Sequence, residues 1–116
     1  MKKIFVFCLL LGLSSPAFAN IDYSRVIEDL PLMQGMDEKA DTAIIFDKPE
    51  GRIIDLSADI QAEAETVLRF YDSALPSLGW QIVSTGRYTR GNEELVIFVE
   101  SNKMVRFSLS PRKVTP

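Results

Sequence analysis

One stretch of this sequence, at about residues 60–75, is long and periodic enough to predict an amphipathic helix. Its apolar residues recur at spacings of three and four, so they share one face, while the charged residues lie elsewhere. We expect Asp59 to cap the N-terminus of this helix, and Pro76 and Gly79 to end it. The apolar face must therefore pack on another layer of structure. Its residues are Ala64, Val67, Leu68, Tyr71, Ala74, Leu75 and Leu78.

Segments with strand character flank this helix on both sides. Before it, the apolar runs at 42–47 and 52–58 are joined by a turn at 48–51, which predicts a hairpin. After it, three further strands are predicted, at residues 80–87, 94–100 and 103–110, with turns at 90–92 and 101–102. The order β-β-α-β-β-β, with short links, predicts a two-layer α+β domain. We expect an antiparallel sheet of about five strands with the helix packed on one face.

The remaining parts of the chain are a leading segment and a short tail. In residues 20–40, the spacing of Tyr23, Val26, Ile27 and Leu30 predicts a short helix that Pro31 ends, and 36–41 is polar enough to predict a solvated loop. The single α+β domain then spans residues 41–111. Residues 112–116 are predicted to be a frayed tail.

The first 19 residues have the pattern of a secretory signal peptide. Lys2 and Lys3 precede an apolar run at residues 4–13, and Ala17-Phe18-Ala19 matches an A-x-A cleavage site before Asn20. The apolar run has ten residues, whereas a spanning helix needs about 20. We therefore expect a cleaved signal, a periplasmic protein, and no stable membrane anchor after cleavage.

The chain after residue 19 lacks the residues that most catalytic sites use. These 97 residues contain no histidine and no cysteine, since the only cysteine, Cys8, lies inside the signal. Ser-His-Asp and Cys-His sites and Cys/His zinc sites are thereby excluded, and no phosphate-binding glycine motif occurs. Glu93 and Glu94 remain as an acid/base pair, but neighbouring strand residues point to opposite faces. We expect no enzyme activity, no cofactor and no metal.

The charge pattern excludes one class of partner and leaves two weak candidates. Without Lys2 and Lys3 the chain has 11 basic and 16 acidic residues, a net charge of −5, which argues against binding nucleic acid. A calcium site at Asp37, Glu38 and Asp41 lacks EF-hand spacing, so a solvated loop is the simpler interpretation. An anion patch of arginines, for which surface ion pairing is the simpler account, would use Arg87, Arg90, Arg106 and Arg112.

Two of the predicted strands are apolar on both faces. Val96 and Phe98 point away from the face that holds Leu95, Ile97 and Val99, and the first strand of the hairpin repeats this pattern. The single helix covers only one face of the sheet. Either the segment from Tyr23 to Met36 covers the second face, or that face docks a partner. Val96 and Phe98 are therefore candidate interaction residues.

The run from Phe70 to Trp80 resembles the pattern F-Y-x-x-x-L-P-x-L-G-W of small exported bacterial proteins and lipoproteins of unknown function. The runs at 46–53 and 31–35 resemble an uncharacterised proteobacterial subset of that family. The resemblance covers most of residues 30–111. It implies export and an α+β domain, and it implies no activity.

The same motif has an explanation in packing. Phe70 and Tyr71 can dock the helix on the sheet, Pro76 ends the helix, Gly79 allows the chain to reverse, and Trp80 starts the next strand as a buried plug. The alternative interpretation is an aromatic ligand cleft formed by Tyr71 and Trp80.

These patterns predict a small exported domain without catalytic activity that serves as an interaction or accessory module in the periplasm. Its expected partner is an envelope protein, and its oligomeric state is left open. The alternative function is the binding of a small ligand or an envelope component near Tyr71 and Trp80.

Overall fold

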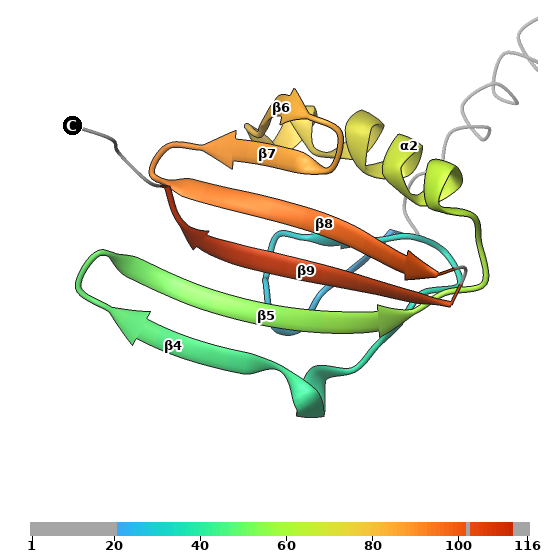
Figure 1. Cartoon of the computed structure of the whole chain (residues 1–116), viewed down its shortest axis with the longest axis horizontal. Helices are drawn as coiled ribbons and strands as arrows, with labels where there is room; N and C mark the ends of the chain where they lie inside the picture. The colour runs from blue at the N-terminus through green and yellow to red at the C-terminus, as the bar shows by residue number, and fades with distance from the viewer. Residues whose placement is uncertain (1–20, 102, 113–116) are drawn as a thin grey trace, which may run out of the picture.

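A computed structural model describes residues 21–101 and 103–112 (Figure 1). The predicted signal peptide and its cleavage residues Ala17, Ala19 and Asn20 lie outside these residues, as do Asn102 of a predicted turn and 113–116 of the predicted tail. The described chain contains α2 (Ala64–Ala74) and two 3-10 turns (Ala40–Thr42 and Pro76–Leu78). Its strands are β1 (Asp22–Tyr23), β2 (Pro31–Leu32), β3 (Asp37–Glu38), β4 (Ile44–Lys48), β5 (Gly51–Asp59), β6 (Gln81–Ser84), β7 (Arg87–Arg90), β8 (Glu93–Ser101) and β9 (Met104–Pro111).

Seven of these strands form one antiparallel sheet. Its order is β3-β5-β9-β8-β7-β6, and β4 also pairs with β5. Because β9 pairs with β5 from Ile54 to Asp59, β4 and β3 follow one another along the other edge of β5. β1 and β2 form a separate two-stranded sheet. The predicted α+β class, the antiparallel pairing and the packing of the helix on the sheet are confirmed.

The sheet has more strands than the predicted five. One additional strand arises because the predicted strand at 80–87 turns back at Gly86, which separates β6 from β7. Gly86 has φ +75°, and a Cβ there would lie 2.7 Å from the carbonyl oxygen of Ile97, so only glycine fits this reversal. β3 is the other additional strand, formed where the sequence predicted a solvated loop.

The predicted short helix between Tyr23 and Leu30 is wrong. The hydroxyl oxygen of Ser24 instead accepts hydrogen bonds from the backbone N–H groups of Val26 and Ile27, at 2.9 Å each. This tight turn lets the chain reverse, so that Tyr23 pairs with Pro31 in the β1–β2 sheet. A serine side chain that binds nearby backbone N–H groups offers the chain an alternative to the helix.

The predicted cap of α2 is also wrong. Asp59 is the last residue of β5, where it pairs with Asp37 and Met104 and forms an ion pair with Lys39 at 3.0 Å. The helix therefore begins at Ala64 rather than near residue 60, and Glu63 occupies the N-cap position without a side-chain cap hydrogen bond. The end of the helix is as predicted, with Pro76 after it and Gly79 at φ +96°.

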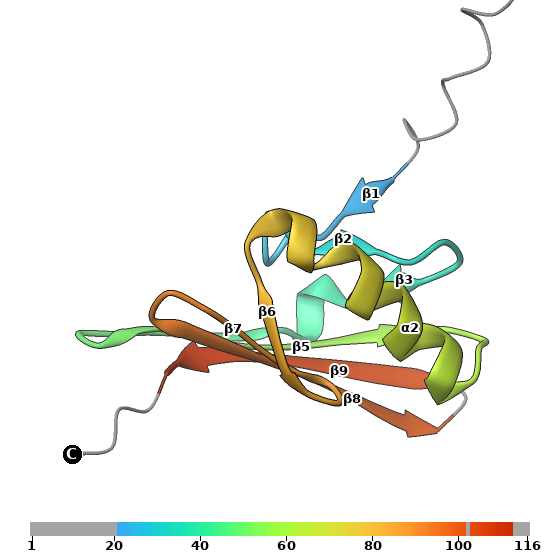
Figure 2. The same cartoon turned by 90° about the horizontal axis from the view of Figure 1, so that it is seen from above.

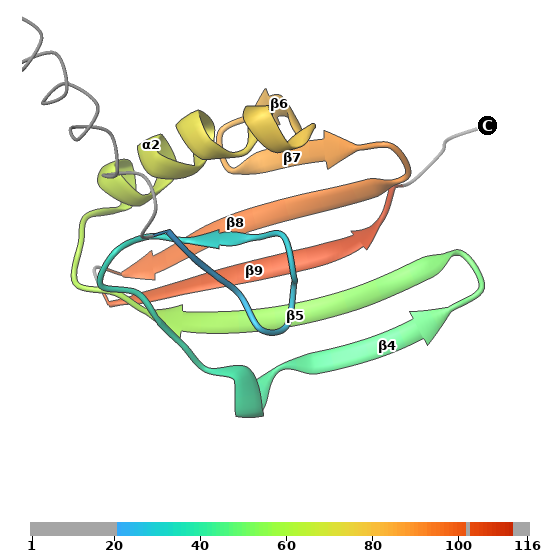
Figure 3. The same cartoon turned by 180° about the vertical axis from the view of Figure 1, so that it is seen from behind.

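One face of the sheet holds the core, which we call the covered face. The inward residues of β5, β8 and β9 pack there against Val67 and Tyr71 of α2 and against Leu75, which follows the helix. The N-terminal segment, residues 21–38, lies on the same side as the helix, and its Ile27 and Leu30 are buried in this core (Figures 2 and 3). The expectation that this segment covers the second face is therefore wrong. Nothing in the described residues covers that second face, which we call the outer face.

Candidate functional site

The four interaction residues proposed from the sequence lie on two different sides of the sheet. Val96 and Phe98 of β8 are on the outer face, where Phe98 is 57% exposed. Tyr71 and Trp80 are buried in the core on the covered side. The structure therefore brings Val96 and Phe98 together and separates them from the two motif aromatics.

The position of Val96 and Phe98 follows from the alternation of β8. Leu95 and Ile97 point into the core, so the residues between them point outward. Across the ladder, Val96 faces Arg87 and Ser108, and Phe98 faces Arg106. We call Val96 and Phe98 the β8 patch.

Ion pairs border the β8 patch on the outer face. Arg87 Nη1 lies 2.7 Å from Glu94 Oε2, and Arg106 Nη2 lies 3.1 Å from Glu100 Oε2. An apolar centre with a charged border is the usual arrangement of a surface that binds another protein. Each of these two arginines is paired with a glutamate, and this supports the interpretation of ordinary surface ion pairs over that of an anion-binding patch.

A second exposed apolar group lies along the edge strand β4, and we call Ile44, Ile45 and Phe46 the β4 edge. Ile44 and Phe46 face Asp55 and Ile53 on the outer face, whereas Ile45 faces Ile54 on the covered face. All three side chains are more than half exposed. The sequence showed the two-sided pattern of this strand but not its place at the edge, because strand order depends on contacts far apart in the chain.

Tyr71 and Trp80 have structural roles in the core. The Tyr71 hydroxyl donates a 2.7 Å hydrogen bond to the carbonyl oxygen of Pro31, and its ring contacts Phe107 edge-on at 5.5 Å between centroids. Burial raises the pKa of Tyr71 above its ordinary value. The Arg90 guanidinium covers the Trp80 ring at 4.3 Å from its centroid. Neither aromatic side chain presents a surface to a ligand in this conformation.

An open cavity of about 470 Å³ lies beside Tyr71 but does not include it. Its apolar lining comes from Phe70 of α2 and from Ile21, Leu32, Met33 and Met36 of the N-terminal segment, and Asp22 and Gln34 also line it. Gly35, which lies between Met33 and Met36 in the chain, lines the cavity as well. The cavity is a surface hollow where the N-terminal segment meets the helix.

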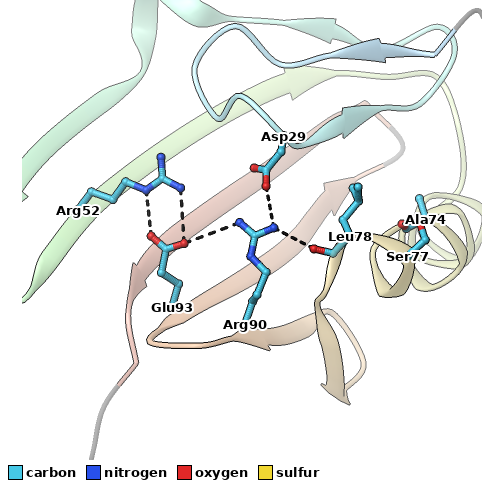
Figure 4. A network of polar contacts seen from close by, with 7 residues as sticks. All are labelled: Asp29, Arg52, Ala74, Ser77, Leu78, Arg90 and Glu93. Carbon is cyan, nitrogen blue, oxygen red and sulfur yellow. Dashed lines mark hydrogen bonds and ion pairs between the residues drawn. The ribbon is translucent and has the colours of Figure 1, made fainter.

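A chain of ion pairs joins the N-terminal segment to one end of the sheet (Figure 4). Arg52 Nε lies 2.9 Å from Glu93 Oε2, and Glu93 Oε1 is 4.0 Å from Arg90 Nη2. Arg90 Nη1 is 2.6 Å from Asp29 Oδ2 and donates a 3.1 Å hydrogen bond to the carbonyl oxygen of Leu78. The hydrogen bond to Glu93 raises the pKa of Arg52, so this guanidinium stays charged.

Four of the five carboxylates considered for chemistry are engaged with other groups of the protein. Glu93 binds Arg52 on the covered face and Glu94 binds Arg87 on the outer face, so the two do not converge. Glu38 accepts hydrogen bonds from the Ser24 hydroxyl and from the backbone N–H of Arg25. Asp37 shares Lys39 with Asp59. Over residues 21–101 and 103–112, no group of three or more acidic side chains is placed to hold a metal ion.

Comparisons with known proteins give no relative for this chain. No family model matches it, and neither the curated proteins nor the solved structures contain a match. Within the part of the chain that the structure describes, no helix is both long and apolar enough to cross a membrane.

Proposed function

We propose that this protein is a non-catalytic interaction module of the periplasm that docks an envelope protein on the outer face of its sheet, at the β8 patch. One observation carries the proposal: Phe98 is 57% exposed beside Val96, on a face that no described residue covers. Exposure of a phenylalanine ring to water is unfavourable, and a partner that covers the ring removes this cost.

The completeness of the core on the covered face supports this assignment. The helix and the N-terminal segment together bury the inward residues of the central strands, and every fully buried side-chain polar atom of the described residues has a hydrogen-bond partner. The buried core therefore lies on the covered face and not on the outer face. That face is available for binding, and the pairs Arg87–Glu94 and Arg106–Glu100 give it a charged border that can orient a partner.

The periplasmic part of the proposal is supported by the sequence. Residues 1–19 have the sequence pattern of a signal peptide with an A-x-A cleavage site, and the chain after residue 19 lacks histidine and cysteine. A small exported domain without the usual catalytic residues is best suited to binding. The partner class we propose is therefore a protein of the same compartment.

A photocrosslinking experiment tests this proposal. Benzoylphenylalanine is placed at position 98 of the exported protein in its own host, and at position 69 as the control, because Arg69 is an exposed residue of α2. We expect one dominant protein adduct from position 98 and none from position 69. The adduct should weaken at least tenfold when Val96→Ser is added. Equal adducts from both positions, or none from position 98, would contradict the proposal.

The alternative function, a ligand site near Tyr71 and Trp80, has its own test. Both side chains are buried, so a ligand must open the core to reach them. Trp80 is the only tryptophan, and its emission therefore reports on such an opening. We expect its emission to stay unchanged when peptidoglycan fragments or lipid vesicles are added. A saturable change would favour the ligand site over the docking module.

A further inference from the structure

Among the edge strands of the sheet in the described residues, β4, which carries the β4 edge, is the longest. All five residues of β4 are exposed, and the strand lies at the outside of the sheet with β5 as its only strand partner (Figure 1). Alternate backbone N–H and C=O groups of such a strand point away from the sheet and can pair with another chain. The apolar side chains of β4 stand on both faces, so a strand that lies alongside it would cover more of them than a partner on one face.

We infer that this edge pairs with β4 of a second copy of the same chain, antiparallel and with the two-fold axis at Ile45. Two sheets would then join into one continuous sheet. This inference does not rest on the docking module proposed above, because it concerns a different strand and a different partner.

The register follows from the positions of the apolar residues. With the axis at Ile45, the two Ile45 side chains face each other on the covered side, where each is 58% exposed in one copy. Ile44 then faces Phe46 of the second copy on the outer side, and the symmetric pair repeats this contact. Every large apolar residue of the strand thereby gains an apolar neighbour, which is the pairing that stabilises a ladder.

The charges of the strand agree with this register. No charged residue occurs from Ala43 to Phe46, so the centre of the pair is free of like-charge contacts. Asp47 falls opposite Ala43 of the second copy, the extended residue that precedes β4, and the pairing ends there because Ala40–Thr42 form a 3-10 turn. A shift of the axis to Phe46 would instead place Ile44 opposite Lys48 and Ile45 opposite Asp47. The register at Ile45 is therefore the better one.

The opposite edge of the sheet does not offer the same site. β6 has four residues, and its pairing with β7 shifts register between Ile82 and Ser84. A bulge of this kind twists an edge strand and interrupts the backbone groups that a further strand would need. Val83 at this bulge is 56% exposed, nearly the same as Ile45, so the two positions form a matched pair.

The size of the contact predicts a weak dimer. The three half-exposed side chains of the β4 edge leave roughly 300 Å² of apolar surface per copy. A stable interface buries about 800 Å² per partner, so this pair belongs to the weak and transient class. We expect a dissociation constant on the order of 100 µM.

Sedimentation velocity of the exported chain over a range of concentrations tests the inference. We expect a monomer–dimer equilibrium in the wild type, and an increase of at least tenfold in the dissociation constant for Ile45→Lys. The matched control Val83→Lys should leave the equilibrium unchanged. Both positions are exposed, and circular dichroism verifies that both variants fold. A wild type that stays monomeric up to about 1 mM, or an equal loss in both variants, would overturn the inference.

Cysteine substitution tests the position of the two-fold axis, because the chain after residue 19 contains no cysteine of its own. Under mild oxidation, Ile45→Cys should give a disulfide-linked dimer, since directly opposite residues have Cα atoms about 5 Å apart. Lys48→Cys should not, because two copies of residue 48 would be separated by six positions, or about 20 Å. Crosslinking at position 48 but not at 45 would exclude the axis at Ile45.

Discussion

The two faces of the central sheet carry phenylalanines on neighbouring strands, and the two side chains meet opposite surroundings. Phe107 of β9 faces Ile97 across the ladder and is fully buried on the covered face, against Tyr71. Phe98 of β8 faces Arg106 and is 57% exposed on the outer face. The same residue type thus stabilises the fold on one face and is available to a partner on the other.

Removal of the buried ring should have the largest effect on stability. Phe107→Ala leaves a cavity between the sheet and α2, and we expect the free energy of unfolding to fall by about 3–5 kcal/mol. Urea denaturation followed by Trp80 emission measures this loss. The domain holds only about 5–10 kcal/mol in total, so much of its stability depends on this ring. A loss below about 1 kcal/mol would remove the difference between the two faces.

The second largest effect on the stability of the covered face should come from high pH. Burial raises the pKa of Tyr71 and of Tyr88 above their ordinary value, and Tyr88 also donates a 2.7 Å hydrogen bond to Asp72. Their contribution is complete below pH 10, where the unfolded chain also keeps both protons. It is lost as the pH rises above 10, because the unfolded chain then releases protons that the folded chain retains.

We therefore expect stability to fall by up to about 1.4 kcal/mol per pH unit for each of these two tyrosines above pH 10. Urea denaturation between pH 9 and 11 measures the slope. The double variant Tyr71→Phe and Tyr88→Phe should have a flatter profile than the wild type. An identical slope in both proteins would show that these two hydroxyls are not held in their protonated form by the core.

The parts of the fold that the sequence predicts are those that local patterns determine. The alternation in β9 placed Val105, Phe107 and Leu109 on one face, and all three are buried. The run from Phe70 to Trp80 predicted where the helix ends, and its tyrosine and tryptophan are in the core. Alternation also predicted that Val96 and Phe98 share the opposite face of the sheet.

The parts that the sequence did not predict depend on contacts between distant residues. The N-terminal segment takes its place on the covered face through Ile27, Leu30 and the hydrogen bond from Tyr71 to Pro31, which is 40 residues away in the chain. The spacing of its apolar residues fits a short helix equally well. The edge position of β4 likewise requires the strand order, and no local pattern in Ile44–Phe46 contains it.

The ion pair that attaches the N-terminal segment to the sheet should contribute less than the core. Asp29→Asn removes the charge that lies 2.6 Å from Arg90, and we expect a loss of about 0.5–1 kcal/mol because the pair is partly exposed. Glu28→Gln is the control, since Glu28 is the exposed neighbour and forms no ion pair within the described residues. Urea denaturation at low and high salt compares them. If both variants lose the same stability, the covered face does not depend on this attachment.

The smallest change in stability is expected on the outer face. Phe98→Ser replaces a ring that is already more than half in water, so the free energy of unfolding should change by no more than about 0.5 kcal/mol. The same urea measurement places this value beside that of Phe107→Ala on the neighbouring strand. A loss above about 1.5 kcal/mol would mean that Phe98 packs within the fold, and the outer face would then be part of the structural core rather than a surface for a partner.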